Sequence, residues 1–232
     1  MVSQQGIHSE TLRTDSSSQR LQRGVFISFE GPEGGGKSTQ AELLAGDLRN
    51  RGHSVVLTRE PGGTPLGEKL RALIKNWEGA DAPCAQSELL LLVAARAQHV
   101  VQCIRPSLQK GCIVICDRFA DSTTVYQGMG RGLDMDFIHA LHQWSVGDCW
   151  PDITFFLDID VKAGLQRAAD RAGMEKVKAY DRFEAASREF HERIREGFLM
   201  LSREAPERIK RIPGGQPADT VHEQVKGFHL KQ

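Results

Sequence analysis

Short hydrophobic runs alternate with longer amphipathic stretches along most of the chain. The runs are rich in β-branched and aromatic residues and predict strands at residues 24–30, 53–58, 112–117, 152–160 and 208–213. Amphipathic spacing predicts helices at residues 38–52, 64–77, 86–108 and 218–230. Pro106 falls in the last turn of the third helix, where it predicts strain because it has no N–H to donate.

The alternation of strands and helices is typical of a parallel sheet. The runs at residues 112–117 and 152–160 are apolar on both faces, as expected of strands that helices cover on both sides. Right-handed crossovers then predict an open, doubly wound sheet. We expect one α/β domain over residues 24–232, preceded by a polar, disordered tail at residues 1–23.

The composition narrows the range of partners. Lys plus Arg total 30 and Asp plus Glu total 30, so the net charge gives no reason to expect a nucleic acid or an anionic membrane as partner. No run reaches the about 18 apolar residues of a membrane helix, and residues 1–23 lack the apolar core of a secretory signal. The five cysteines include no C-x-x-C pair. We therefore expect a protein of the reducing cytoplasm.

The loop after the first strand carries the most specific motif of the sequence. Gly31-x-x-x-x-Gly36-Lys37-Ser38 matches G-x-x-x-x-G-K-[ST], between a strand and a helix as the motif requires. Lys37 would reach the β- and γ-phosphates of a nucleoside triphosphate, and the Ser38 hydroxyl would help to hold Mg²⁺. The predicted phosphate-binding residues are Gly31, Glu33, Gly34, Gly35, Gly36, Lys37, Ser38 and Thr39.

Three classes of protein use such a loop: GTPase switches, motor or regulatory ATPases, and small-molecule kinases. A GTPase needs an Asn-Lys-x-Asp guanine reader, and Asn50 and Asn76, the only asparagines, lack that context. Residues 170–173 spell D-x-x-G but follow a helical stretch, where the motif requires a strand, so we interpret this match as coincidence. The sequence therefore disfavours a switch.

Arginines at strand ends indicate a second anion site. Arg59 and Arg118 each follow a predicted strand, and ligands of such sheets bind beyond the carboxyl ends of the strands. Because the loop already holds one set of phosphates, these donors favour a second phosphate group; ion-paired surface arginines are the alternative, above all for Arg71. An ionised phosphate acceptor needs no general base, so catalysis would be positioning and charge neutralisation. Asp117 stands where a Mg²⁺-associated carboxylate is expected.

Seven segments resemble bacterial thymidylate kinases, in matching order from about Gly24 to the C-terminus. They read FEGPEGGGKST, TREPGGTPLGEKLR, LLLVAARAQH, CDRFADSTTVYQGMGRG, PDITFFLDID, DRFE and FHERIREGF. The resemblance implies a three-layer P-loop kinase fold with a five-stranded parallel sheet flanked by helices, and usually a homodimer. It also implies transfer of a phosphoryl group from ATP·Mg²⁺ to dTMP, giving dTDP.

The resemblance assigns roles around dTMP. Glu33 would lie near the sugar 3′-hydroxyl, Arg71 and Arg118 would hold the acceptor phosphate, and Arg96 would donate to a thymine carbonyl. Tyr126 would crowd the 2′ position against ribose. The other residues expected around dTMP are Arg59, Glu60, Leu92, Ser122, Thr123 and Gln127.

Leu92 and His99 lie close to Arg96 in the sequence. Where the family commonly has a phenylalanine that stacks on thymine, this chain has Leu92, which loses an aromatic stacking contribution of about 0.5–1.5 kcal/mol. Weaker or broader base selection therefore stays open. His99 is expected to be a packing or surface residue, because this mechanism gives a catalytic base nothing to do.

A charged segment at about residues 167–182 resembles the mobile lid in which family members without an arginine in the phosphate loop place catalytic arginines. It has Gly173 as a hinge and offers Arg167 to ATP. Arg171 is the first choice for the transferred phosphoryl group and Arg182 the second. Lid closure would exclude water and add positive charge. With these two, the predicted catalytic residues are Glu33, Lys37, Arg118, Arg171 and Arg182.

Two alternatives to a dTMP kinase stay open from the sequence. One is another nucleoside or nucleoside-monophosphate kinase, distinguished by the base that the pocket accepts. The other is a phosphate-loop regulatory protein that binds ATP without transferring phosphate.

Overall fold

The computed structural model describes residues 23–75, 82–174, 183 and 186–228. Its centre is a five-stranded sheet of order β2-β3-β1-β4-β5, in which all neighbouring strands are parallel. The strands are β1 (Phe26–Glu30), β2 (Val55–Arg59), β3 (Ile113–Asp117), β4 (Ile153–Asp158) and β5 (Ile209–Pro213). The predicted α/β class and the five parallel strands are confirmed.

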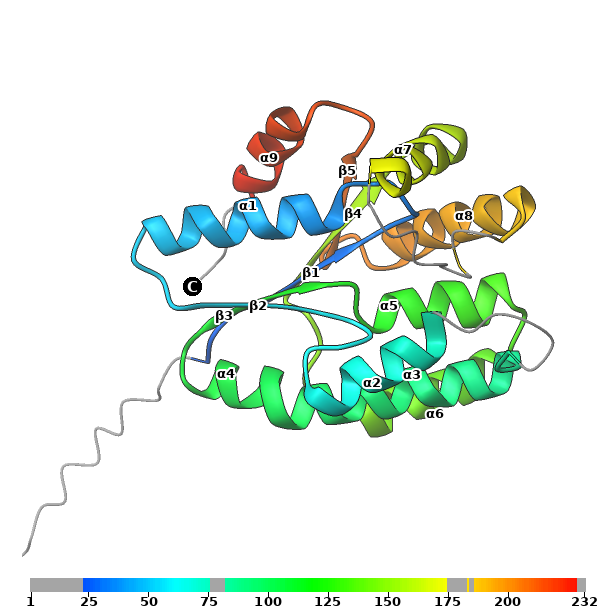
Figure 1. Cartoon of the computed structure of the whole chain (residues 1–232). Coiled ribbons are helices and arrows are strands. Elements are labelled where there is room, and N and C mark those ends of the chain that lie inside the picture. Colours follow the sequence, from blue (N-terminus) through cyan, green and yellow to red (C-terminus); the bar gives the residue numbers. More distant parts are fainter. Residues whose placement is uncertain (1–22, 76–81, 175–182, 184–185, 229–232) are drawn as a thin grey trace, which may run out of the picture.

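Helices cover both faces of the sheet, which gives three layers (Figure 1). On one side lie α1 (Lys37–Asn50) and α9 (Ala218–Lys226). The other helices are α2 (Pro65–Lys75), α3 (Ala85–His99), α4 (Arg105–Gln109), α5 (Ala120–Thr123), α6 (Met135–Ser145), α7 (Val161–Met174) and α8 (Arg188–Glu204). Of these, α2 to α6 lie on the opposite side from α1 in Figure 1.

The central strand β1 is buried on both of its faces. Ile27 and Phe29 are buried in the cluster that includes Leu44 of α1, whereas Phe26 is buried in the cluster that includes Ile104 on the other face. Successive side chains of a strand point to opposite faces, so helices on both sides bury both sets. The face of Phe26 also buries Ser28 and Glu30, which are polar.

The helix predicted at residues 86–108 is interrupted by a π-helical segment. This segment spans Val100–Ile104, between α3 and α4. There the Arg105 N–H donates to the carbonyl of Val100, five residues back. The wider turn leaves room just before Pro106, which has no N–H for the ladder. The prediction was right in place and wrong in treating these residues as one regular helix.

Several elements of the structure lie where the sequence predicted none. A second π-helical segment, Thr124–Gly130, and the helices α6 and α8 lie in stretches for which no element was predicted. The first part of the predicted lid, residues 167–174, is helical because α7 extends to Met174. Residues 175–182, with Arg182, and residues 1–22 of the predicted tail lie outside the described residues.

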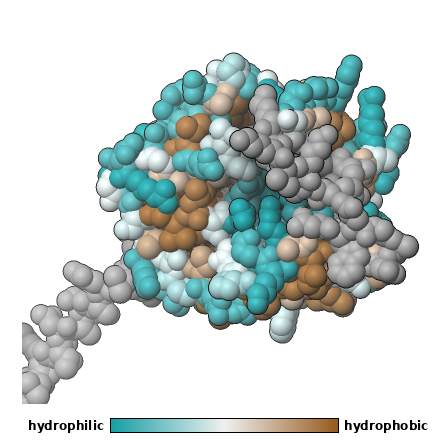
Figure 2. All heavy atoms as spheres, in the orientation of Figure 1, coloured by the Kyte–Doolittle hydropathy of each residue, from teal (hydrophilic) through white to brown (hydrophobic). Residues whose placement is uncertain are grey.

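Two observations concern the polarity of the molecule. In Figure 2, hydrophilic residues gather over the middle of the visible face, where Figure 1 has the carboxyl ends of β2 and β3. In the part of the chain that the structure describes, no helix is both long and apolar enough to cross a membrane.

Candidate active site

The phosphate loop connects β1 to α1 as the motif predicts. Gly34 and Gly36 have positive φ values of 69° and 88°. A Cβ on Gly34 would lie 2.0 Å from the carbonyl oxygen of Gly164, so glycine is required there for both space and conformation. Lys37 is buried and its Nζ donates to the carbonyl of Pro32 at 2.7 Å. Its ammonium group and the N-terminus of α1 thus lie together at the loop, as phosphate binding requires.

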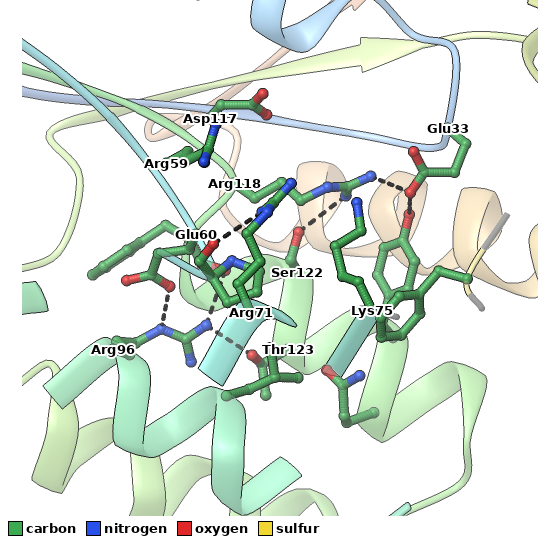
Figure 3. Close-up of a pocket in the computed structure, with 16 residues that line it drawn as sticks. Glu33, Arg59, Glu60, Arg71, Lys75, Arg96, Asp117, Arg118, Ser122 and Thr123 are labelled. Atoms are coloured by element: carbon green, nitrogen blue, oxygen red, sulfur yellow. Dashed lines mark hydrogen bonds and ion pairs between the residues drawn. The ribbon is translucent and has the colours of Figure 1, made fainter. Parts of the chain in front are cut away.

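A pocket lies next to this loop, at the carboxyl edge of the sheet. Every residue predicted to surround dTMP lines it, namely Glu33, Arg59, Glu60, Arg71, Leu92, Arg96, Arg118, Ser122, Thr123, Tyr126 and Gln127. Figure 3 shows their side chains converging from the phosphate loop, the ends of β2 and β3 and the neighbouring helices. The structure therefore brings the predicted residues together, and their individual roles stay predictions.

Arg118 joins the pocket to the phosphate loop. It follows β3 with a positive φ of 66°, a conformation that is uncommon for a residue with a side chain. Its guanidinium donates to the carbonyl of Gly31 at 3.1 Å, to Ser122 at 3.2 Å and to Glu33 at 2.5 Å. The same group lies 5.0 Å from the ring centroid of Tyr126. One side chain therefore contacts the phosphate loop, α5 and the aromatic wall of the pocket.

The negative charge of Glu33 is stabilised in an anion-binding loop because positively charged side chains surround it. Burial alone would raise the pKa of its carboxyl group, but the charges of Arg118, Lys37 and Lys75 outweigh burial and lower this pKa to about 2. The hydroxyl of Tyr126 also donates to the carboxylate, at 3.3 Å. Glu33 is therefore ionised at neutral pH, and it offers an acceptor at the rim of the pocket.

Ser38 and Asp117 are paired where a Mg²⁺ ion is expected. The Ser38 hydroxyl donates to Oδ2 of Asp117 at 2.5 Å, and Oδ1 of Asp117 is buried without a hydrogen-bond partner among the described residues. Those residues contain no cluster of three or more histidine, cysteine or acidic side chains that could hold a metal. Mg²⁺ commonly takes one or two protein ligands and completes its shell with phosphate oxygens and water, so this pair fits it.

Arg96 is a buried arginine, and one nitrogen of its guanidinium has no hydrogen-bond partner among the described residues. It is 2% exposed, its Nε donates to Glu60 Oε2 at 2.8 Å, and its Nη2 donates to Thr123 at 2.8 Å. Its Nη1 has no partner among the described residues, although buried donors are nearly always paired. An arginine held in this way fits a ligand that brings its own acceptor.

The pocket also contains residues that the sequence analysis left without a role. They are Pro61, Lys75, Phe119 and Phe183. Lys75 ends α2, and its charge acts on Glu33. The ring of Phe183 lies 6.0 Å from that of Tyr126, edge to face. Pro61, Phe119 and Phe183 lie within segments that carry the family resemblance, but no role was assigned to them; Lys75 lies in none of those segments.

His99 does more than pack. It is completely buried, with Nδ1 at 3.0 Å from Glu60 Oε1 and Nε2 at 2.7 Å from the Thr58 hydroxyl. Burial alone would lower the pKa of its imidazole, but hydrogen bonds to the Cys103 thiol and to Glu60 outweigh burial and raise this pKa to about 9. The expectation of a packing or surface residue missed this polar contact with the pocket.

Comparison with known proteins decides the family. The sequence model described as thymidylate kinase matches residues 29–225. The chain belongs to the thymidylate kinase family. It is 50% identical over 198 residues to the thymidylate kinase of Geobacter sulfurreducens, which covers 85% of this chain and 92% of that protein. It is 48% identical over 200 residues to that of Desulfovibrio desulfuricans, covering 85% and 91% respectively. The crystal structure of the Ehrlichia chaffeensis thymidylate kinase superimposes with a TM-score of 0.68 at 39% identity, covering 88% of this chain and 97% of that one.

The lid arginines expected from the family resemblance are only partly placed. Arg167, on α7, donates to the carbonyls of Gly214 and Gly215 at 2.9 Å each, so it joins α7 to the loop after β5. Arg171 is exposed on the same helix and is not among the residues that line the pocket. The contact of either arginine with a nucleotide stays a prediction.

The raised pKa of His99 makes stability depend on pH in a defined window. A histidine whose pKa is higher in the folded state stabilises the fold fully below its unfolded pKa, and this contribution is lost as the pH rises through the folded value. We expect the free energy of unfolding to fall by about 2–3 kcal/mol more in the wild type than in His99→Asn between pH 6.5 and about 9. Urea titrations of both proteins at the two pH values measure the free energy of unfolding. An equal decrease in the wild type and in His99→Asn would contradict the prediction.

Proposed function

We propose that this protein transfers the γ-phosphoryl group of ATP to dTMP, giving dTDP and ADP. The observation that carries the proposal is Arg118, which lines the pocket and bonds to Gly31 and Glu33 of the phosphate loop. An acceptor phosphate held by Arg118 would lie beside the loop that holds the donor phosphates. Membership of the thymidylate kinase family supports the same reaction.

Positive charge in the pocket suits the acceptor phosphate. Arg71 donates to the carbonyl of Pro61 at 2.9 Å, and Arg59 pairs with Glu68 at 2.9 Å, so both side chains are oriented. With Arg118 and Lys37 they would offset the repulsion between acceptor and donor phosphates. Because the acceptor oxygen is already ionised, the residues need only position the two phosphates and stabilise the charge of the transition state.

The other residues of the pocket suit a deoxynucleoside. Glu33 would accept a hydrogen bond from the 3′-hydroxyl, and Tyr126 would occupy the space of a 2′-hydroxyl. Arg96 would donate to a thymine carbonyl, with Leu92, Thr123 and Gln127 around the base. Gln127 donates to Glu88 at 2.8 Å, which fixes its side-chain amide.

Ser38 and Asp117 would hold Mg²⁺ together with the donor phosphates, and bound Mg²⁺ would neutralise phosphate charge. Glu33, Lys37 and Arg118 are the proposed catalytic residues in the described part of the site. From the lid, Arg171 or Arg182 would add positive charge to the transferred phosphoryl group. Arg167 would contact the nucleotide near the loop after β5. We also propose a cytoplasmic location.

We further propose a homodimer, formed by α3, the π-helical segment after it and α6. Leu90, Val101, Phe137 and Trp144 are exposed by 52%, 65%, 53% and 78%. Leu90 and Val101 lie about three helical turns apart, and Phe137 and Trp144 about two, so each pair shares a face of its helix. The two helices α3 and α6 contact each other. A second copy would bury these large apolar side chains.

Charge at this face tests the homodimer. We expect Trp144→Glu to be monomeric in light scattering after gel filtration, because burying the carboxylate in an apolar interface is costly. Met200→Glu, which changes an exposed apolar residue of α8, is the control and is expected to stay dimeric. A dimeric Trp144→Glu protein would place the interface elsewhere.

A substrate panel tests the reaction. We expect ADP release with ATP·Mg²⁺ to be fastest with dTMP, slower with dUMP, UMP, CMP and AMP, and absent with thymidine, which lacks the phosphate that Arg118 would hold. Activity on another monophosphate would keep the mechanism and discard the choice of base. ATP binding without turnover of any of them would favour a regulatory protein.

The variant Arg118→Ala tests binding of the acceptor separately from binding of the donor. We expect the KM for dTMP to rise and kcat to fall, together by about 10²-fold or more in kcat/KM, while the Kd for ATP changes by less than about 3-fold. Steady-state kinetics and calorimetry with a non-hydrolysable ATP analogue measure the two effects. Unchanged dTMP kinetics would remove Arg118 from the acceptor site.

A further inference from the structure

We propose that His99 is a positioning residue for dTMP, which fixes Glu60 and, through Glu60, the guanidinium of Arg96. The inference rests on the proposed function, because it assigns His99 to the binding of the same substrate. His99 does not line the pocket itself. Its effect on the substrate must therefore pass through the residues that it contacts.

The first contact path is a buried chain of hydrogen bonds. His99 Nδ1 lies 3.0 Å from Oε1 of Glu60, and Oε2 of Glu60 accepts from Arg96 Nε at 2.8 Å. Each carboxylate oxygen thus has its own partner. The side chains of His99, Glu60 and Arg96 are exposed by only 0%, 4% and 2%. With so little solvent contact, the geometry of the chain depends on its members.

The opposite side of the ring is fixed as well. Nε2 of His99 lies 2.7 Å from the hydroxyl of Thr58 on β2. The imidazole therefore bridges the sheet and the carboxylate of Glu60, so β2 sets where that carboxylate lies. Arg96 Nη2 is fixed in turn by Thr123 at 2.8 Å. Only Nη1 of this guanidinium is left without a partner among the described residues.

A second contact path leads toward the acceptor phosphate. A Cβ on Gly63 would lie 2.4 Å from Nε2 of His99, so the ring packs directly against the loop that follows β2. In that loop, the carbonyl of Pro61 accepts from Arg71 Nη1 at 2.9 Å. His99 therefore supports both the arginine proposed for the base and one arginine proposed for the phosphate.

The titratable groups that face His99 make its Nδ1 a permanent donor near neutral pH. Glu60 approaches from the end of β2, and Cys103 approaches from the π-helical segment. Together they raise the pKa of the imidazole to about 9 against the opposing effect of burial. An apolar side chain of similar size could fill the space but could not donate to Glu60. The buried Oε1 would then lack a partner, and the carboxylate would reorient on Arg96.

Two nearly isosteric variants separate positioning from packing. His99→Asn retains an amide donor close to the position of Nδ1, whereas His99→Leu has almost the same shape without a donor. We expect His99→Leu to raise the KM for dTMP by about 10-fold or more, the effect of leaving a buried acceptor unpaired, with the KM for ATP within about 2-fold of wild type. His99→Asn should restore the KM for dTMP to within about 3-fold of wild type.

A matched control removes a different buried histidine. His222 on α9 is also buried and bonds to Asp47 at 2.9 Å, outside the pocket. We expect His222→Leu to lower the melting temperature and leave the KM for dTMP unchanged. Calorimetric titration of each protein with dTMP gives the affinity without turnover.

Each outcome has one meaning for the proposal. An unchanged KM for dTMP in His99→Leu, in a protein whose wild type phosphorylates dTMP, overturns the positioning role and leaves the proposed function intact. Equal increases in His99→Leu and His99→Asn also overturn it, since they indicate loss of packing instead of loss of a donor. A wild type that neither binds nor phosphorylates dTMP refutes the proposed function and this inference with it.

Discussion

The ion pair between Arg118 and Glu33 is the interaction on which the site depends. Both side chains are 16% exposed, so each charge is mostly withdrawn from water and needs the other. The pair crosses from the end of β3 to the phosphate loop, which the fold places side by side because β1 and β3 are neighbours. It therefore joins the phosphate loop to the pocket proposed for the acceptor, and it accounts for an acidic residue in a loop that binds anions.

A second buried carboxylate holds the segment that presents Arg118. Glu30, the last residue of β1, accepts from the backbone N–H of Phe119 at 2.7 Å and from the Ser122 hydroxyl at 2.6 Å. Burial, and then the charge of Asp121, raise the pKa of Glu30 to about 7. The start of α5 is thus fixed from the sheet by directional bonds to an acidic side chain. Such bonds can hold Arg118 in its unusual backbone conformation, which packing alone would relax.

The predicted part of the site has two sources. Some residues follow from a local motif or from the end of a strand, and others around the pocket, such as Arg96 and Tyr126, were expected from the family resemblance. The phosphate loop is local, and Arg59 and Arg118 follow from strand ends, so the sequence is enough to find them. His99 could not be recognised in this way, because its partners Thr58 and Glu60 come from another element. The π-helical segment was missed for a related reason: Pro106 predicts that regular bonding fails but not which wider turn replaces it.

The end of the pocket proposed for the base would combine a strong polar contact with a weak apolar one. Leucine in place of phenylalanine at position 92 gives up about 0.5–1.5 kcal/mol of stacking free energy, but its aliphatic side chain still covers an apolar surface. A base without an acceptor for Arg96 would leave a buried charged donor unpaired, which costs about 1–3 kcal/mol or more. If the proposed assignment holds, base selection would depend more on how firmly Arg96 is held than on which apolar residue covers the ring. Under the proposal for His99, the specificity of this site would rest on the buried chain from Thr58 through His99 and Glu60.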